Sequence, residues 1–293
     1  MAYPRGRCPA CESRRVVHLR EIDGYDYFQC PTCEMLFIDS FVLNEIDGGS
    51  NIRKYDAEYW QMELPDAKER AYGVALARTA EVIYYTRIPI ERFIDVGAGP
   101  GYFLDAISRH LPSHSGRFYG VELFPPHVEH RTKHQNYMVG SLKDVPFSFD
   151  SGLCMEVIEH LSPRMLRSLL EEIAHKSRRG ACYIFNTGLP EYVLREDPNY
   201  LDPKRRGHVI SWSVSAVRAL CAGLEFDVFP IRGKTWAFIL ERRLNDGVSA
   251  PDFTKDIRER VWSALPENLE LLMDRTMGSV LKILGHHTIL AFS

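Results

Sequence analysis

Between Glu91 and Arg242 the chain alternates short apolar runs with longer amphipathic stretches. The short runs predict buried strands, and the amphipathic stretches predict helices. This alternation is typical of an α/β fold, in which helices cover both faces of a mostly parallel sheet. Only Arg232–Thr235 separates the last two runs, so these two strands are expected to be antiparallel. The expected strands are residues 92–96, 117–121, 137–139, 151–155, 181–186, 225–230 and 236–241, and the expected helices are residues 102–110, 125–134, 163–177 and 213–222.

The segments on either side of this region have a different character. Residues 39–64 read as a polar and aromatic connector, and residues 65–85 predict a helix rich in Ala, Glu and Arg. Two more helices are expected at residues 252–264 and 266–284, where an apolar stripe packs on the core or forms a dimer interface. The monomer and the homodimer therefore both stay open. The expected domains are residues 1–40, 41–90, 91–243 and 244–293.

Composition and charge narrow the class of protein. A chain of 293 residues with 45% hydrophobic residues has room for one full α/β domain with additions at both ends. The formal net charge of −3 provides no basic field, so tight nonspecific binding of nucleic acid is not expected. No apolar run approaches the length of a membrane span, and residues 1–8 lack the apolar core of a signal peptide. We therefore expect a cytoplasmic protein without a membrane partner.

Four of the seven cysteines stand in two Cys-x-x-Cys pairs near the N-terminus: Cys8 with Cys11, and Cys30 with Cys33. Two such pairs can place four thiolates around one tetrahedral Zn²⁺, as in a zinc ribbon. A disulfide pair is the main alternative, which a reducing cytoplasm disfavours. Because so short a segment buries only a small core, the metal is expected to hold residues 1–40 folded. Structural support is the preferred role of the ribbon, and a grip on a substrate or nucleic acid stays open.

The first strand of the α/β region runs into a glycine-rich turn. Residues 91–101 read Glu-Arg-Phe-Ile-Asp-Val-Gly-Ala-Gly-Pro-Gly, and the glycines remove the Cβ atoms that would keep the backbone away from a ligand. The helix expected from Tyr102 turns its unpaired N–H groups toward that ligand. The dinucleotide fingerprint G-x-G-x-x-G does not fit, because the glycines alternate as G-x-G-x-G. The turn therefore predicts a nucleotide-like cofactor.

The turn resembles motif I of the class I S-adenosylmethionine-dependent methyltransferases, and the resemblance covers roughly residues 91–242. It implies a Rossmann-like seven-stranded methyltransferase sheet in the order 3-2-1-4-5-7-6. It also implies that Glu122, after the second strand, binds both ribose hydroxyls, and that Asp95 fixes the turn or reaches the methionine amino group. Ser141 departs from the family, where an Asp commonly contacts the adenine. The expected cofactor-binding residues are Asp95, Gly97, Ala98, Gly99, Gly101, Tyr102, Glu122, Leu123, Ser141, Leu142 and Met155.

Acidic and imidazole side chains follow the fourth strand. Glu156, Glu159 and His160 are spaced so that a helical turn would place all three on one face. Their convergence suggests a general base or a divalent-metal site where the methyl group meets its acceptor. The stretch resembles the E-V-x-E-H-L segment of many class I methyltransferases. Together with His208 it resembles the small-RNA 3′-terminal 2′-O-methyltransferases, in which two Glu and two His bind a divalent cation. Mg²⁺ or Mn²⁺ on these four residues, a metal-free base at His160 or His208, and purely structural roles all stay open.

The expected reaction is methyl transfer from S-adenosylmethionine to an oxygen of a polar hydroxylated small molecule. A zinc ribbon ahead of such a domain resembles methyltransferases that modify sugars in polysaccharide or natural-product pathways, so a saccharide-like acceptor is preferred. Metal-assisted methylation of an RNA 2′-hydroxyl is the first alternative. A noncatalytic module that binds the cofactor or a partner is the second, and the intact glycine turn and Glu122 argue against it.

Overall fold

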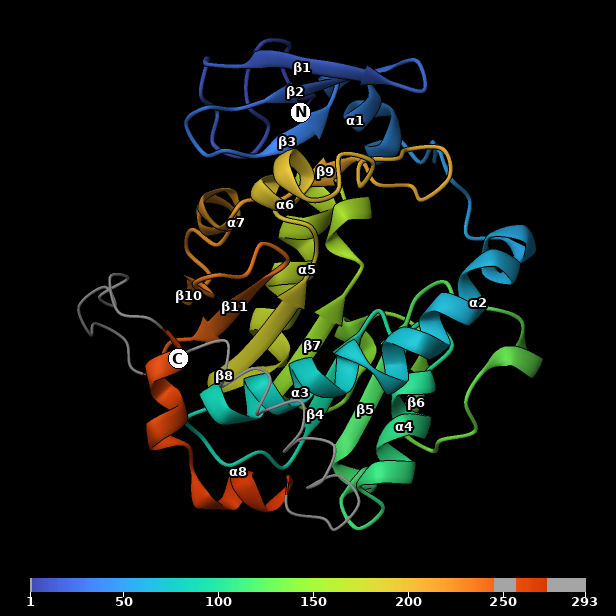
Figure 1. Cartoon of the computed structure of the whole chain (residues 1–293), viewed down its shortest axis with the longest axis vertical. Coiled ribbons are helices and arrows are strands. Elements are labelled where there is room, and N and C mark those ends of the chain that lie inside the picture. Colours follow the sequence, from blue (N-terminus) through green and yellow to red (C-terminus); the bar gives the residue numbers. More distant parts are fainter. Residues whose placement is uncertain (1, 245–256, 273–293) are drawn as a thin grey trace. The chain divides into compact units, whose positions relative to one another are not determined.

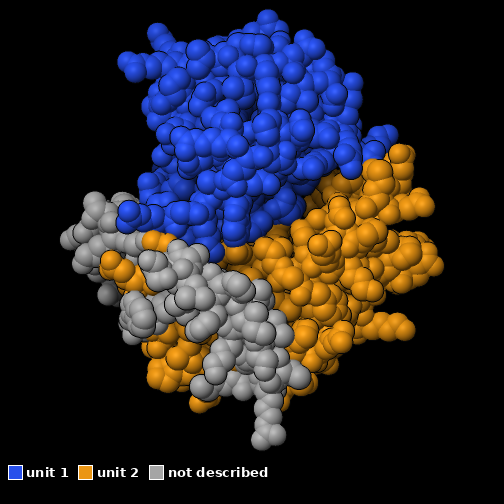
Figure 2. Space-filling view, viewed as in Figure 1, with its two compact units in different colours: residues 1–54, 156–174, 186–238 blue, residues 55–155, 175–185, 239–293 orange. Residues whose placement is uncertain are grey.

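The computed structural model describes residues 2–244 and 257–272 (Figure 1). The chain divides into two compact units, each of which combines segments that are far apart in the sequence (Figure 2). Unit 1 comprises residues 1–54, 156–174 and 186–238. Unit 2 comprises residues 55–155, 175–185 and 239–293.

Seven strands form the larger sheet. They are β4 (Phe93–Val96), β5 (Phe118–Glu122), β6 (Tyr137–Val139), β7 (Phe149–Met155), β8 (Ser177–Asn186), β10 (Phe226–Pro230) and β11 (Ala237–Arg242). Their order, β10-β11-β8-β7-β4-β5-β6, is the expected order 3-2-1-4-5-7-6 read from the opposite edge. The Rossmann-like methyltransferase sheet is therefore confirmed.

The strands at the centre of this sheet are parallel and buried. β4 pairs in parallel with β5 and with β7, so that Asp95 lies opposite Gly120 and Leu153. All four residues of β4 are buried, as expected for a strand covered on both faces. A Cβ atom on Gly152 of β7 would lie 2.4 Å from the carbonyl oxygen of Ile94. Glycine at this position therefore lets β7 lie close to β4, whose carboxyl end leads into the glycine turn.

The helices of unit 2 differ from the expected ones in two places. They are α2 (Ala57–Tyr72), α3 (Val74–Tyr85), α4 (Tyr102–His110) and the short α8 (Pro266–Glu270). The expected helix over residues 65–85 begins earlier and is divided at Gly73, since the Asp56 side chain caps α2 by accepting a hydrogen bond from the Tyr59 N–H at 3.1 Å. The expected helix over residues 125–134 is absent, because two consecutive prolines disfavour helical backbone. Only a 3₁₀ turn, η2 (Val128–His130), forms there.

The smaller sheet, in unit 1, joins the N-terminal segment to a distant part of the chain. Its strands are β1 (Val17–Ile22), β2 (Tyr25–Gln29), β3 (Leu36–Ile38) and β9 (Ile210–Ser211), in the order β1-β2-β3-β9 with each pair antiparallel. Leu36 pairs with Ser211, and Phe37 pairs with Ile210. The N-terminal segment is therefore completed by a strand from far along the sequence.

Four helices also begin within unit 1: α1 (Ser40–Asp47), α5 (Pro163–Lys176), α6 (Pro190–Arg195) and α7 (Val214–Leu220). The first lies in a segment that the sequence reads as a connector, and the Asp39 side chain caps it by accepting a hydrogen bond from the Phe41 N–H at 2.7 Å. Most of the expected C-terminal helices, at residues 252–264 and 266–284, falls outside the described residues, apart from α8 and the 3₁₀ helix η5 (Ile257–Ser263). No helix in the described ranges is both long and apolar enough to cross a membrane.

Candidate functional site

The glycine turn after β4 adopts a backbone that favours glycine at each alternating position. Gly97, Gly99 and Gly101 have φ values of 77°, 54° and 79°, in the left-handed region. A Cβ atom on Gly101 would lie 2.3 Å from Thr132 Cγ2 and 2.8 Å from Tyr137 Cδ2, so a side chain has no room there. Gly101 is the N-cap residue of α4 and provides no side-chain cap, so the first turn of the helix has N–H groups that a ligand or water can bind.

The Glu122 carboxylate at the end of β5 is held against this turn. Its Oε2 accepts a hydrogen bond from the Gly99 N–H at 2.8 Å, and its Oε1 accepts one from the Phe124 N–H at 2.7 Å. Burial raises the pKa of Glu122, and these backbone donors oppose the rise. Each carboxylate oxygen keeps lone-pair capacity beyond its backbone bond, so the group can also accept from a pair of hydroxyls. The ribose contact expected of Glu122 stays a prediction, with which this geometry is compatible.

Asp95 lies in β4 and is only 6% exposed. Burial raises the pKa of its carboxyl to about 7, and the nearby Glu122 carboxylate contributes to the rise. A carboxyl group in this state gains a proton easily and ionises readily when a cation lies beside it.

The other residues expected to bind the cofactor lie around the same strand ends of unit 2. The Ala98 N–H donates to the Val121 carbonyl at 3.1 Å, and the Gly140 N–H donates to the Glu122 carbonyl at 2.9 Å. The second bond brings Ser141 and Leu142, at the start of the 3₁₀ turn η3 (Leu142–Asp144), to the end of β5. Tyr102 is the first residue of α4, Leu123 follows β5 and is exposed, and Met155 ends β7. Their contacts with a cofactor remain a prediction.

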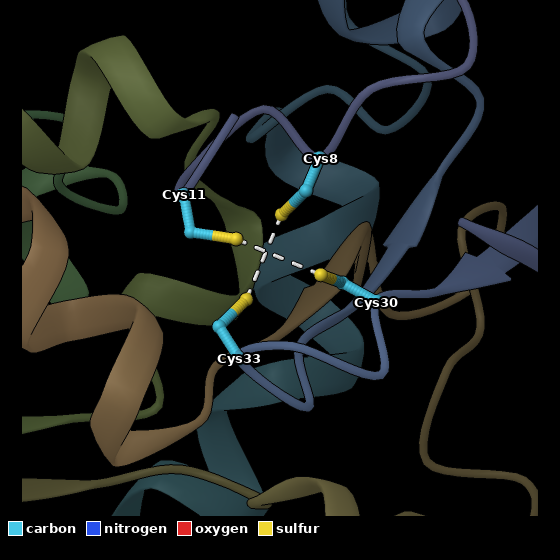
Figure 3. A group of neighbouring side chains, drawn as sticks. All are labelled: Cys8, Cys11, Cys30 and Cys33. Atoms are coloured by element: carbon cyan, nitrogen blue, oxygen red, sulfur yellow. Dashed lines mark hydrogen bonds between the residues drawn. The ribbon is translucent and has the colours of Figure 1, made fainter. Parts of the chain in front are cut away.

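The four N-terminal cysteines converge from two turns, with their side chains pointing toward one another (Figure 3). The Sγ atoms of Cys8 and Cys33 are 3.6 Å apart, as are those of Cys11 and Cys30. A tetrahedral Zn²⁺ with Zn–S bonds of about 2.3 Å separates its sulfur ligands by about 3.8 Å. A disulfide would require about 2.05 Å. The four sulfurs therefore fit a zinc ion, and they are not bonded as disulfides.

The two cysteine turns have the same construction. Each reads Cys-Pro-x-Cys-Glu, and the glutamate, Glu12 or Glu34, has a positive φ. The Glu12 N–H donates to the Cys8 carbonyl at 2.9 Å, and the Glu34 N–H donates to the Cys30 carbonyl at 2.7 Å. Each turn is thus closed by a backbone hydrogen bond that holds its two thiols on the same side, as a single metal ion requires.

A second group of metal-ligand type lies within unit 1. Glu159 and His160 belong to the 3₁₀ turn η4 (Ile158–His160), and His208 lies just before β9. Ligand atoms of all three lie within 4.8 Å of one another. The His208 Nδ1 lies 2.8 Å from the Tyr200 carbonyl, and the His160 Nδ1 lies 3.1 Å from the Gly207 carbonyl. A carbonyl only accepts, so both imidazoles donate from Nδ1. In the neutral form the lone pair is then on Nε2, which is the arrangement that metal-binding and basic histidines share.

Glu159 supplies the carboxylate of this group and is 0% exposed. Its Oε2 accepts a hydrogen bond from Thr187 Oγ1 at 3.0 Å. Its Oε1 lies 3.9 Å from His208 Nε2 and accepts no hydrogen bond within the described part of the chain. Burial raises the pKa of Glu159. A buried carboxylate oxygen beside two imidazole lone pairs fits either a divalent cation or a proton shared with a histidine.

Glu156 is not one of the three residues whose ligand atoms all lie within 4.8 Å of one another, although its side chain interacts with Glu159. Its backbone is left-handed, with a φ of 52°, so the helical turn expected from Glu156 to His160 does not form. Its Oε1 accepts from Asn186 Nδ2 at 2.9 Å, and its N–H donates to the Asn186 carbonyl at 2.9 Å. The structure thus brings together three of the four residues expected as catalytic or metal-binding groups.

Sequence reasoning missed the residues that hold His208 in place. Tyr27 in β2 donates its hydroxyl hydrogen to the His208 carbonyl at 2.8 Å, and the Val209 carbonyl accepts from the Ile38 N–H at 3.0 Å. The Ser213 hydroxyl donates to the Cys33 carbonyl. The ribbon therefore supports the segment that carries His208. No local motif marks Tyr27. The position of Thr187 directly after β8 could have indicated a role, since residues at the carboxyl ends of strands bind ligands in such sheets.

Comparisons with known proteins agree with the fold. Residues 94–185 match the family model described as a methyltransferase domain. The comparison with curated protein sequences gave no match. Among solved structures, a protein described as the putative methyltransferase in a complex with the Haloferax volcanii Trm112 methyltransferase activator is 18% identical, with a TM-score of 0.46 over 65% of this chain and 98% of that one.

Two solved sugar-related enzymes are similar to the same extent. An amino pentose methyltransferase from Micromonospora echinaspora is 16% identical, with a TM-score of 0.46 over 60% of this chain and 95% of that one. A sugar N-methyltransferase from Streptoalloteichus is 13% identical, with a TM-score of 0.45 over 59% and 88%. Such low similarities carry no information about what this chain acts on. Residues 94–185 thus match a methyltransferase domain, and they contribute strands to the Rossmann-like sheet of that fold.

Proposed function

We propose that the chain is an S-adenosylmethionine-dependent methyltransferase. The observation that carries the proposal is the Glu122 carboxylate bound to the Gly99 N–H, because it joins the glycine turn to a ribose acceptor at the ends of adjacent parallel strands. The match of residues 94–185 to a methyltransferase domain supports it. In this proposal the α4 N-terminus, Asp95 and the Ser141–Leu142 segment hold the remaining parts of the cofactor.

Calorimetric titration with S-adenosylmethionine and S-adenosylhomocysteine tests this assignment. The wild-type protein is expected to bind both at micromolar concentration. Glu122→Gln is expected to weaken binding by roughly 10- to 100-fold. Its amide NH₂ group would face one of the two backbone N–H donors, and the charge-assisted hydrogen bonds from the ribose hydroxyls to the carboxylate would be lost. The exposed Glu129→Gln serves as the matched control. No binding by the wild-type protein at millimolar cofactor would favour the noncatalytic module instead.

For the acceptor, we propose an oxygen of a polar hydroxylated small molecule, of saccharide type. The hydroxyl oxygen attacks the methyl carbon in line, the carbon–sulfur bond breaks, and S-adenosylhomocysteine leaves with the electron pair. The hydroxyl proton passes to a base, for which the Nε2 lone pair of His208 or His160 is the proposed acceptor. Glu159 beside His208 would stabilise the imidazolium that results.

A second candidate function is metal-assisted methylation of an RNA 2′-hydroxyl, favoured specifically by the group of Glu159, His160 and His208. A divalent cation bound there would lower the pKa of a coordinated hydroxyl. Methyl transfer from labelled S-adenosylmethionine should be compared for a panel of saccharides and for RNA oligonucleotides with free 3′ ends, in chelator and after addition of Mg²⁺ or Mn²⁺. Saccharide methylation that is insensitive to chelator supports the metal-free base, and RNA methylation restored by the cation supports the second candidate.

A further inference from the structure

One aromatic side chain of α2 packs directly on the glycine turn. Trp60 is 8% exposed, and a Cβ atom on Gly99 would lie 3.4 Å from its Cη2 and 3.6 Å from its Cζ3. The six-membered ring of the indole therefore lies at contact distance from the turn. Asp56 sets this position from the start of the helix, because its carbonyl accepts from the Trp60 N–H at 3.1 Å while its side chain accepts from the Tyr59 N–H.

The indole N–H of Trp60 is buried and has no acceptor within the described residues. Trp212 shows the usual arrangement, since its buried Nε1 donates to the Ile158 carbonyl at 2.7 Å. Buried donors are nearly always paired, because an unpaired one carries the full cost of its lost hydration. The indole N–H only donates, so the group missing beside Trp60 must be a hydrogen-bond acceptor.

An aromatic row links this donor to the other side of the proposed ribose site. Trp60 meets Tyr59 edge-on with ring centroids 5.2 Å apart, Tyr59 meets Tyr55 at 4.9 Å, and Tyr55 stacks on Phe124 at 5.7 Å. The row therefore runs from Gly99 to Phe124, the two residues whose N–H groups hold the Glu122 carboxylate. The indole of Trp60 thus lies in the same cluster of unit 2 residues as Glu122, the residue proposed to bind the ribose.

We propose that Trp60 is a further cofactor-binding residue, whose Nε1–H donates to the carboxylate of the amino-acid part of S-adenosylmethionine. This inference rests on the proposed function. The carboxylate is the anionic group of the cofactor, and charge-assisted acceptors form the stronger hydrogen bonds. The ribose hydroxyls donate to Glu122 in the proposed site, and their oxygens are neutral and therefore weaker acceptors. The ammonium nitrogen has no lone pair, and the sulfonium sulfur is cationic and so does not accept from an N–H donor.

The test compares two ligands that differ in the amino-acid part. S-adenosylhomocysteine carries the carboxylate, whereas 5′-methylthioadenosine keeps the adenosine and lacks the amino acid. Trp60→Phe retains an aromatic ring on Gly99 and removes the N–H. By calorimetry, this variant should bind S-adenosylhomocysteine about 10- to 100-fold more weakly than wild type while its affinity for 5′-methylthioadenosine changes less than about twofold. Glu122→Gln should weaken both ligands, because both contain the ribose.

Equal losses for the two ligands, or no loss for S-adenosylhomocysteine, would overturn the role of Trp60 and leave the proposed function intact. Failure of the wild-type protein to bind either ligand would overturn the proposed function itself. Without ligand, Trp60→Phe should unfold at the same temperature as wild type or higher, whereas Trp212→Phe should unfold lower because it loses a formed hydrogen bond. In wild-type protein, the ¹⁵N–¹H resonance of Trp60 Nε1 should shift downfield with S-adenosylhomocysteine and not with 5′-methylthioadenosine, which tests the bond without any substitution.

Discussion

The buried carboxyl of Asp95 should make the stability of the ligand-free protein depend on pH. Burial raises its pKa from 3.8 to about 7, so between these values the folded protein keeps a proton that the unfolded chain has released. The folded state then binds more protons than the unfolded state, and the free energy of unfolding falls as pH rises through this window. Above about pH 7 both states are ionised and the dependence ends.

The size of the effect follows from the two pKa values. Within this window each pH unit lowers the free energy of unfolding by about 1.36 kcal/mol. The destabilisation caused by Asp95 therefore grows by roughly 3 kcal/mol between pH 5 and pH 8. Asp95→Asn removes the ionisation in both states. The variant is therefore expected to gain roughly 3 kcal/mol relative to wild type across this range. The titrating groups that do not interact with Asp95 are common to the two proteins and cancel, whereas Glu122 also loses a neighbouring negative charge in the variant.

Urea unfolding of both proteins at pH 5, 6, 7 and 8, without cofactor, measures this difference. The exposed Asp144→Asn variant controls for the change in net charge. A difference between Asp95→Asn and wild type that stays constant from pH 5 to pH 8 would refute the reasoning, because it would show that Asp95 is ionised in the folded protein throughout. Saturating S-adenosylhomocysteine should flatten the dependence in wild type, since the ligand's ammonium group offers Asp95 a cationic partner.

Three further results are expected. Gly101→Ala should lower the unfolding temperature more than Gly233→Ala, because both positions have a positive φ but only at Gly101 does the new Cβ meet Thr132 and Tyr137. The free energy of unfolding should fall by about 1–3 kcal/mol more in Gly101→Ala than in Gly233→Ala, and equal shifts of the two variants in calorimetry would contradict this. Elemental analysis should find one zinc per chain in the purified protein and substantially less in Cys30→Ser, whose thermal transition should also be lower; metal-free protein with free thiols and an unchanged transition would rule out the zinc ribbon. Thr187→Val should destabilise the protein by about 1–3 kcal/mol by removing a donor from the buried Glu159 carboxylate, while Thr187→Ser should retain most of the stability; urea unfolding in which the two variants behave alike would count against this bond.

Much of the fold could be read from local patterns. The runs that became β4 and β7 were predicted as buried strands from their short apolar stretches, and nearly all of their residues are buried in the structure. The alternation of elements predicted a mostly parallel sheet, and the short connection before β11 predicted an antiparallel last pair. The strand order itself was what the resemblance of the glycine turn to class I methyltransferases implied, and the structure has that order. Helix limits were less predictable, because capping by Asp39 and Asp56 and the paired prolines after Phe124 act on one or two residues rather than over a whole pattern.

The sequence by itself determined which groups are chemically equipped for function. Two cysteines three positions apart in each turn, alternating glycines and an acid after a strand are local features, and short-range backbone geometry brings their atoms together. Only the tertiary structure decided which distant residues meet. It joined β9 to β3 beside the segment that carries His208, gave Glu156 a left-handed backbone in place of the expected helical turn, and laid Trp60 on Gly99 with its N–H unpaired among the described residues. These outcomes depend on strand register and on side-chain packing between segments far apart in the chain, and spacing along the sequence carries no information about either.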